Sequence, residues 1–189
     1  MTQTENKSLD PKLEKRLKML DKKLNQLLEE LKYYSEAQLN RKPGKGKWSA
    51  IQVMHHLLLA ETGSFNYLQK KLGYNAELRN AGIQSWFRKQ GLKFFLWAPF
   101  KWKAPPKIGD EYLPVHAGFW DTAKLWIEQR NQLKSYLATL PPDVFKKEAY
   151  NHPRAGRMDI NGMVGFFDQH FDRHHKQIRG IVKDYTKQI

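Results

Sequence analysis

The sequence predicts an all-α fold: a four-helix bundle with a long crossover between its second and third helices. Three observations predict it. Leucines repeat as a heptad through the first 34 residues, a capping signature opens a second helix, and apolar residues recur at steps of three and four near the C-terminus. The chain has 189 residues, of which 40% are hydrophobic and 28% charged. This length and composition fit one domain, residues 1–189, with a sizeable core.

The first helix is predicted to start at Asp10, which can cap it, with Pro11 at the first helical position. Its apolar residues alternate between steps of four and three: Leu13, Leu17, Leu20, Leu24, Leu27, Leu31 and Tyr34. A two-chain coiled coil could use this seam. The seam ends within residues 32–38, however, after about the length of one bundle helix, which favours an antiparallel bundle. Residues 40–47, with their proline and glycines, are predicted to form a loop.

The second helix is predicted from a capping box, in which Ser49 is followed three residues later by Gln52. Trp48 and Val53 flank the box as a hydrophobic staple. The helix should run to about Leu72.

A crossover insertion follows, over about residues 74–118, in which the helical periodicity weakens. Its aromatic residues are Trp86, Phe87, Phe94, Phe95, Trp97, Phe100 and Trp102, interleaved with Arg88, Lys89, Lys93, Lys101, Lys103 and Lys107. This basic aromatic segment, residues 84–107, suits an interfacial membrane segment, a nucleic-acid surface or a lid. Packing on the bundle or on a second subunit is the favoured interpretation, because so many rings would otherwise be exposed. Nucleic acid and membrane are therefore secondary candidates as partners.

The third helix is predicted from apolar spacing that ends at two prolines, and the fourth from a stripe near the C-terminus. The third stripe is Phe119, Ala123, Trp126, Arg130, Leu133 and Leu137. Residues 143–157 should form a connection, and the last helix should run over about 160–187. Its inward stripe is Met163, Phe167, His170, His174, Ile178, Ile181 and Tyr185.

Composition narrows the classes of function. The chain has no cysteine, which excludes disulfides and thiolate metal sites. Residues 1–13 lack an apolar leader, and no stretch approaches 18 uninterrupted apolar residues, so we expect a cytoplasmic protein. The net charge of +14 would attract nucleic acid, anionic lipid or acidic partners, but charge alone does not choose among them.

Three histidines are the candidate metal ligands. His170 and His174 lie one turn apart on an inward stripe, where their Cβ atoms are about 5–6 Å apart and two ring nitrogens can converge on one ion. His56, on the second helix, can supply a third imidazole. Hydrogen-bonded core histidines are the alternative. His55 and His175 lie about 100° around their helices from His56 and His174, so a small helix rotation would exchange them.

Several short fragments occur in a recognisable order. They are Lys47-Trp48-Ser49, His56-Leu57 with Glu61, His152-Pro153 with Gly156 and Arg157, and finally His170, His174 and Gln177-Ile178. In order and spacing the chain resembles the DinB/YfiT-like bundles, also called the DinB superfamily, over about residues 10–187. The resemblance implies an up-down-down-up bundle and a metal triad at His56, His170 and His174. It also implies metal-dependent enzymes that act with low-molecular-weight thiols. The aromatic, lysine-rich crossover departs from the family pattern.

A site of three neutral imidazoles would leave the charge of a divalent ion uncompensated. Water, hydroxide or an anionic substrate would then occupy its open positions. We therefore predict a metal-dependent thiol transferase or hydrolase that acts on a small molecule, with a low-molecular-weight thiol as a cosubstrate and a homodimer as an assembly to test. Zinc or nickel is the expected ion, and imidazole also suits iron and copper.

The catalytic residues are not identified by the sequence. Glu61 is a candidate for supporting a ligand or acting as general base, but it is rotated about 140° from His56 around the helix. A carboxylate between helices is an equally good interpretation. A rival function is a non-enzymatic binding module, whose basic aromatic crossover engages an anionic membrane, a nucleic acid or a protein.

Overall fold

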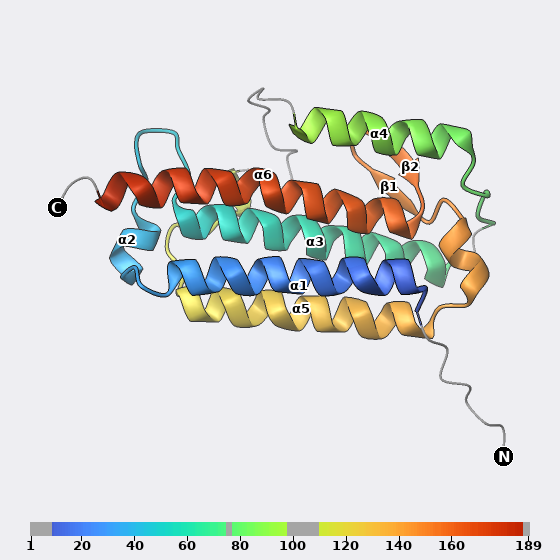
Figure 1. The fold of residues 1–189 in the computed structure, drawn as a ribbon, viewed down its shortest axis with the longest axis horizontal. Coiled ribbons are helices and arrows are strands. Elements are labelled where there is room, and N and C mark those ends of the chain that lie inside the picture. The colour runs from blue at the N-terminus through green and yellow to red at the C-terminus, as the bar shows by residue number, and fades with distance from the viewer. Residues whose placement is uncertain (1–8, 75–76, 98–109, 187–189) are drawn as a thin grey trace, which may run out of the picture.

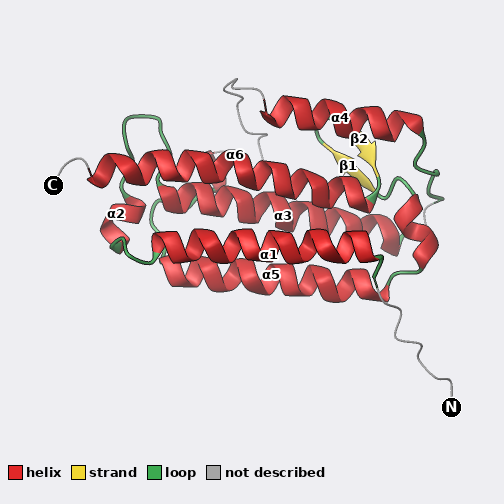
Figure 2. Ribbon diagram, viewed as in Figure 1, coloured by secondary structure: helices red, strands yellow, loops and turns green. Residues whose placement is uncertain are grey.

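A computed structural model describes residues 9–74, 77–97 and 110–186. These residues are mostly helical, with one small two-stranded sheet, which confirms the all-α prediction (Figure 2). The α-helices are α1 (Pro11–Leu31), α2 (Glu36–Asn40), α3 (Ala50–Gly73), α4 (Ile83–Trp97), α5 (Phe119–Thr139) and α6 (Ile160–Thr186). The other elements are the 3₁₀ helices η2 (Asp110–Tyr112) and η3 (Pro142–Lys146) and the strands β1 (Tyr150–His152) and β2 (Gly156–Met158). Within the described ranges, no helix has both the length and the apolarity needed to cross a membrane.

The starts of α1 and α3 are fixed by side-chain caps. Asp10 accepts hydrogen bonds from the backbone N–H groups of Lys12 and Leu13 at the start of α1. At the start of α3, Ser49 Oγ accepts from the Gln52 N–H at 3.2 Å, and Gln52 Oε1 accepts from the Ser49 N–H at 3.1 Å. This reciprocal pair is the predicted capping box. Caps satisfy backbone donors that have no partner inside the helix, so short local patterns locate the helix ends.

The four long helices, α1, α3, α5 and α6, lie side by side (Figure 1). Both α5 and α6 contact α1 and α3. The predicted leucine stripe of α1 is buried from Leu13 to Leu31. The core divides into two apolar clusters, one around the second half of α1 and the first part of α3, the other around the opposite ends of these helices. A buried ion pair, Glu61 with Arg130, lies at the level between them.

The crossover contains a helix that the sequence did not predict. α4 packs against α6 and β2 through a narrow face, where Leu92 and Leu96 are buried. Trp86, Phe87 and Phe94 lie on the other side, so apolar residues occur all around the helix and produce no clear period. Trp86 and Phe94 are 52% and 66% exposed, which corrects the expectation that they pack on their own chain. The predicted segment beyond Trp97, with Phe100, Trp102, Lys101, Lys103 and Lys107, lies outside the described residues.

The connection before the last helix is also more ordered than expected. β1 and β2 pair antiparallel, with Tyr150 opposite Met158 and His152 opposite Gly156. Gly156 has φ +80°, a left-handed conformation that favours glycine. Three-residue strands are too short to show an alternating pattern, which is why the sequence indicated only a connection. The hairpin lies between α4 and the bundle (Figure 2) and contacts both α3 and α6.

Candidate metal centre

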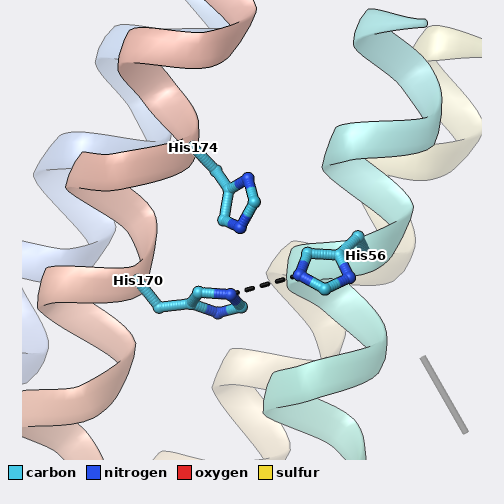
Figure 3. A group of neighbouring side chains, drawn as sticks. All are labelled: His56, His170 and His174. Atoms are coloured by element: carbon cyan, nitrogen blue, oxygen red, sulfur yellow. Dashed lines mark hydrogen bonds between the residues drawn. The ribbon is translucent and has the colours of Figure 1, made fainter. Parts of the chain in front are cut away.

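The three predicted histidines meet between α3 and α6. His56 projects from α3 toward His170 and His174 of α6, and the three rings face one another (Figure 3). Each residue offers a ring nitrogen, and these nitrogens all lie within 4.8 Å of one another. His56 Nε2 and His170 Nε2 lie 3.1 Å apart. Two nitrogens bound to one tetrahedral ion at about 2.0–2.1 Å would be about 3.4 Å apart, so the spacing suits a shared ion.

Apolar rings surround the triad. Trp48 lies against His56, with ring centroids 4.9 Å apart, and Phe166 stacks on His170 at 5.0 Å. His56 and His170 are buried, with 4% and 7% of their surfaces exposed. His174 keeps part of its surface accessible. Aromatic rings thus cover two sides of the site, and His174 is the least buried of its three side chains.

The hydrogen bonds around the triad leave ring nitrogens for an ion. Gln177 Oε1 lies 2.8 Å from His174 Nδ1. This oxygen can only accept, so His174 Nδ1 carries the proton and Nε2 has a free lone pair. His170 Nδ1 is buried without a hydrogen-bond partner. Protein interiors rarely leave such atoms unpaired. The three side chains each offer a ring nitrogen to one shared position, so the residues present fit a bound metal.

Burial keeps the two imidazoles of α6 neutral. Desolvation, together with the neighbouring imidazoles, lowers the pKa of His170 well below its usual 6.5. Desolvation by burial and the proximity of His56 lower the pKa of His174 to about 3, although its bond to Gln177 opposes the shift. Only a neutral imidazole has the lone pair that a metal needs. These ligands are therefore ready to bind at neutral pH, before any ion arrives.

The neighbouring histidines are engaged elsewhere. His55 Nε2 lies 3.0 Å from Thr122 Oγ1 of α5, and His175 Nε2 lies 2.9 Å from Glu30 of α1. The helix rotations thus bring His56 and His174, and not His55 and His175, to the shared site. His116 is exposed in a connection. His152 is buried in the hairpin, where its Nδ1 accepts from the backbone N–H groups that follow it.

Comparison with protein families supplies independent support for the fold. The family model of the DinB superfamily matches residues 16–178. The chain belongs to the DinB superfamily. The match includes all three histidines of the triad. No curated protein and no solved structure matched the chain.

In this DinB-superfamily chain, Glu61 is paired with an arginine. Both of its carboxylate oxygens accept from Arg130 of α5, at 2.7 and 2.9 Å, and the two side chains are 3% and 4% exposed. Arg130 also donates to the carbonyl of Leu20 in α1. This arrangement favours the interpretation of Glu61 as a carboxylate between helices over its role as general base.

Sequence reasoning missed Phe166, the ring that stacks on His170. The available signal was spacing: Phe166 precedes His170 by four residues, which places both on one face of α6. The predicted stripe used Phe167 instead. Phe167 is also buried, at 1% exposed, and both rings belong to the second apolar cluster, but it is Phe166 that stacks on His170.

The buried histidines predict an acid-sensitive fold. Burial, followed by the charge of Arg154, lowers the pKa of His152 to about 4. Between pH 6.5 and the folded-state values of about 4 for His152 and about 3 for His174, the unfolded chain binds more protons than the folded one. The contribution of these two neutral histidines to the free energy of unfolding is therefore fully present above pH 6.5, and it is lost as the pH falls through this window. We expect each histidine to cost roughly 1–2 kcal/mol of unfolding free energy by pH 5.

Urea unfolding of the metal-free protein at neutral pH, and at steps down to mildly acidic pH, measures this loss. His152→Gln should make the decline shallower, because the proton-binding group is gone. His116→Gln is the matched control, since His116 is exposed. Equal slopes for His152→Gln and the parent would contradict the prediction.

Proposed function

We propose that this protein is a metal-dependent enzyme of thiol-transfer or hydrolytic type that acts on a small molecule. The observation that carries the proposal is the meeting of three imidazoles, those of His56, His170 and His174, at one buried site, where desolvation keeps the two imidazoles of α6 neutral. The DinB resemblance adds support, because it implies metal-dependent enzymes that act with low-molecular-weight thiols. Zinc or nickel is the proposed ion.

The chain's own residues would each have a defined task. His56, His170 and His174 would hold the ion through one ring nitrogen each. Gln177 fixes the tautomer of His174 through their 2.8 Å contact. Trp48 and Phe166 keep water away from the faces of His56 and His170. The partly exposed side of His174 leaves a path by which substrate would approach.

The charge of the site supports a nucleophile at neutral pH. A divalent ion bound there would lower the pKa of water or of a thiol in its open positions. Glu61 would not compensate the charge of the ion, because Arg130 occupies both of its oxygens. A small anion would therefore be favoured as the further ligand.

We expect metal-dependent turnover in one of two reaction classes. Protein loaded with zinc or nickel should accelerate either the conjugation of a small thiol to an electrophile or the hydrolysis of a small ester or amide, and the metal-free protein should not. A panel of low-molecular-weight thiols with electrophiles, and a second panel of chromogenic esters and amides, separate the two classes. Turnover by ions released from the protein is controlled by assaying the metal alone.

His170→Ala provides the negative control for the panel, and His55→Ala the positive one, because His55 contacts Thr122 rather than the triad. If loaded protein shows no turnover in either class, the non-enzymatic binding module becomes the better account.

The order of the helices and the oligomeric state belong to the same proposal. We infer the bundle order up-down-down-up, supported by the drawn directions of the long helices: α1 and α6 run one way, α3 and α5 the other (Figure 1). This order requires a long connection between two helices that run the same way, which the crossover between α3 and α5 provides. A homodimer remains a prediction, to be tested by light scattering.

A further inference from the structure

The outer face of α4 presents an apolar patch. Among the side chains of this helix that the structure describes, four large ones are exposed: Ile83 by 73%, Trp86 by 52%, Phe87 by 61% and Phe94 by 66%. At about 100° per residue, their positions fall within about 100° of one another around the helix. We call these four residues the α4 patch. Contiguous apolar surface of this kind usually marks an interaction site.

The opposite face of α4 holds the helix firmly on the protein. Ser85, Leu92 and Leu96 are buried there, at 1%, 5% and 9% exposed. Two ion pairs tie the helix to its surroundings: Lys89 with Asp159 at 2.9 Å, and Arg88 with Glu148 at 3.4 Å. Figure 1 draws α4 outside the four long helices, beside α6 and the hairpin. The α4 patch therefore faces outward from a fixed helix.

The charges around the patch are basic. No acidic residue occurs in the sequence from Arg79 to Gly109. Lys93 is exposed on α4 itself, and the neighbouring hairpin exposes Arg157. The nearest acids, Glu148 and Asp159, are already paired with α4. With the net charge of +14, this face would be attracted to an anionic surface.

We propose that α4 docks the protein onto the surface of an anionic lipid bilayer. The helix would lie in the interface plane, with the α4 patch at the boundary of the acyl chains and Lys93 among the headgroups. An apolar face flanked by basic residues on one helix is the pattern of such interfacial segments. The chain would lie on the membrane and not span it.

Two other occupants fit the observations less well. A second copy docked through the same patch would bring together two proteins that each carry a net charge of +14. A nucleic acid needs basic side chains available for phosphates, and Arg88 and Lys89 are engaged with carboxylates.

Flotation with vesicles tests the proposal on the full chain. Vesicles of phosphatidylcholine with phosphatidylserine should bind the parent protein, and vesicles of phosphatidylcholine alone should bind it far less. The triple variant Trp86→Ser, Phe87→Ser, Phe94→Ser should lose more than about tenfold in partitioning, because binding scales with the apolar area that enters the interface. Lys93→Glu should weaken binding relative to the parent, and the difference should widen as salt is lowered, because charge interactions are then less screened.

The matched control removes exposed apolar area from another face. Trp120 and Leu125 of α5 are 61% and 53% exposed, and Trp120→Ser with Leu125→Ser should bind vesicles like the parent. Thermal unfolding and metal content should match the parent for all variants, because the α4 patch is exposed and lies outside the triad. This separates the outcome from that of the proposed enzyme.

Four results would overturn the proposal. The first is equal binding of the parent to neutral and anionic vesicles, and the second is an equal loss of binding in the α5 control. The third is a parent that forms a dimer and binds no vesicles, with the dimer lost in the triple variant. The fourth is a triple variant that loses only oligonucleotide binding.

Discussion

Protein purified without a histidine tag or a chelating column should carry about one transition-metal ion per chain, and His170→Ala with His174→Ala should carry none. The reason is geometric: the ring nitrogens of the triad lie within 4.8 Å of one another, and removing two of them leaves only His56. One imidazole cannot hold an ion against water. Elemental analysis of the purified chains gives the answer and names the metal.

The double variant His170→Ala with His174→Ala should also lose the increase in unfolding free energy that bound metal gives the parent. An ion that binds only the folded chain raises its unfolding free energy by about 2.7 kcal/mol when present at a hundredfold excess over its dissociation constant. The parent should show this increase when zinc or nickel is added to metal-free protein. His55→Ala and His175→Ala are matched controls, because their contacts are Thr122 and Glu30. Stoichiometric metal in the double variant would place the site elsewhere.

Breaking the buried ion pair should destabilise the fold strongly. Glu61→Gln leaves the guanidinium of Arg130, only 4% exposed, without its anion, and Arg130→Met leaves the carboxylate without its cation. Removing one partner of such a pair costs about 3–5 kcal/mol, because the remaining charge stays buried and uncompensated. Chemical unfolding of the two single variants measures this cost.

The double variant Glu61→Leu with Arg130→Met separates the pair's net contribution from the penalty of an orphaned charge. We expect it to be much closer to the parent than either single variant, since apolar groups of similar volume replace both charges. The exposed pair Lys18 with Glu14 is the control, and replacing either partner should change stability by less than about 1 kcal/mol. Additive losses in the double variant would show that the two charges act independently.

The sequence predicted those features that depend on local pattern. The leucine seam of α1 and the caps at Asp10 and Ser49 are confirmed, because periodicity and capping are decided within a few turns of one helix. The convergence of His170 with His174 follows from the geometry of a single helix. The addition of His56 needed the family resemblance, since periodicity alone could not align α3 with α6.

Features that depend on pairing between distant segments were missed. Arg130 stood on the predicted inward stripe of α5, and a buried charge requires a partner. Nothing local could show that this partner is Glu61, which lies 69 residues away in the sequence. α4 was missed for another reason. It buries one narrow face and exposes aromatic rings on the other, so its apolar residues show no helical period in the sequence. Physical reading of a sequence is weakest where apolar residues face solvent.

The ion pair between the two apolar clusters also fixes the axial alignment of the packed helices. Leucine-rich stripes would interdigitate almost as well after a shift of one turn, about 5.4 Å along the axis. Such a shift of α5 against α3 would separate Arg130 from Glu61, and it would pull Arg130 from the carbonyl of Leu20 in α1. One side chain therefore selects a single alignment of three helices. Glu61 lies five residues beyond His56 on α3, so the alignment that it enforces also sets the height at which His56 faces α6.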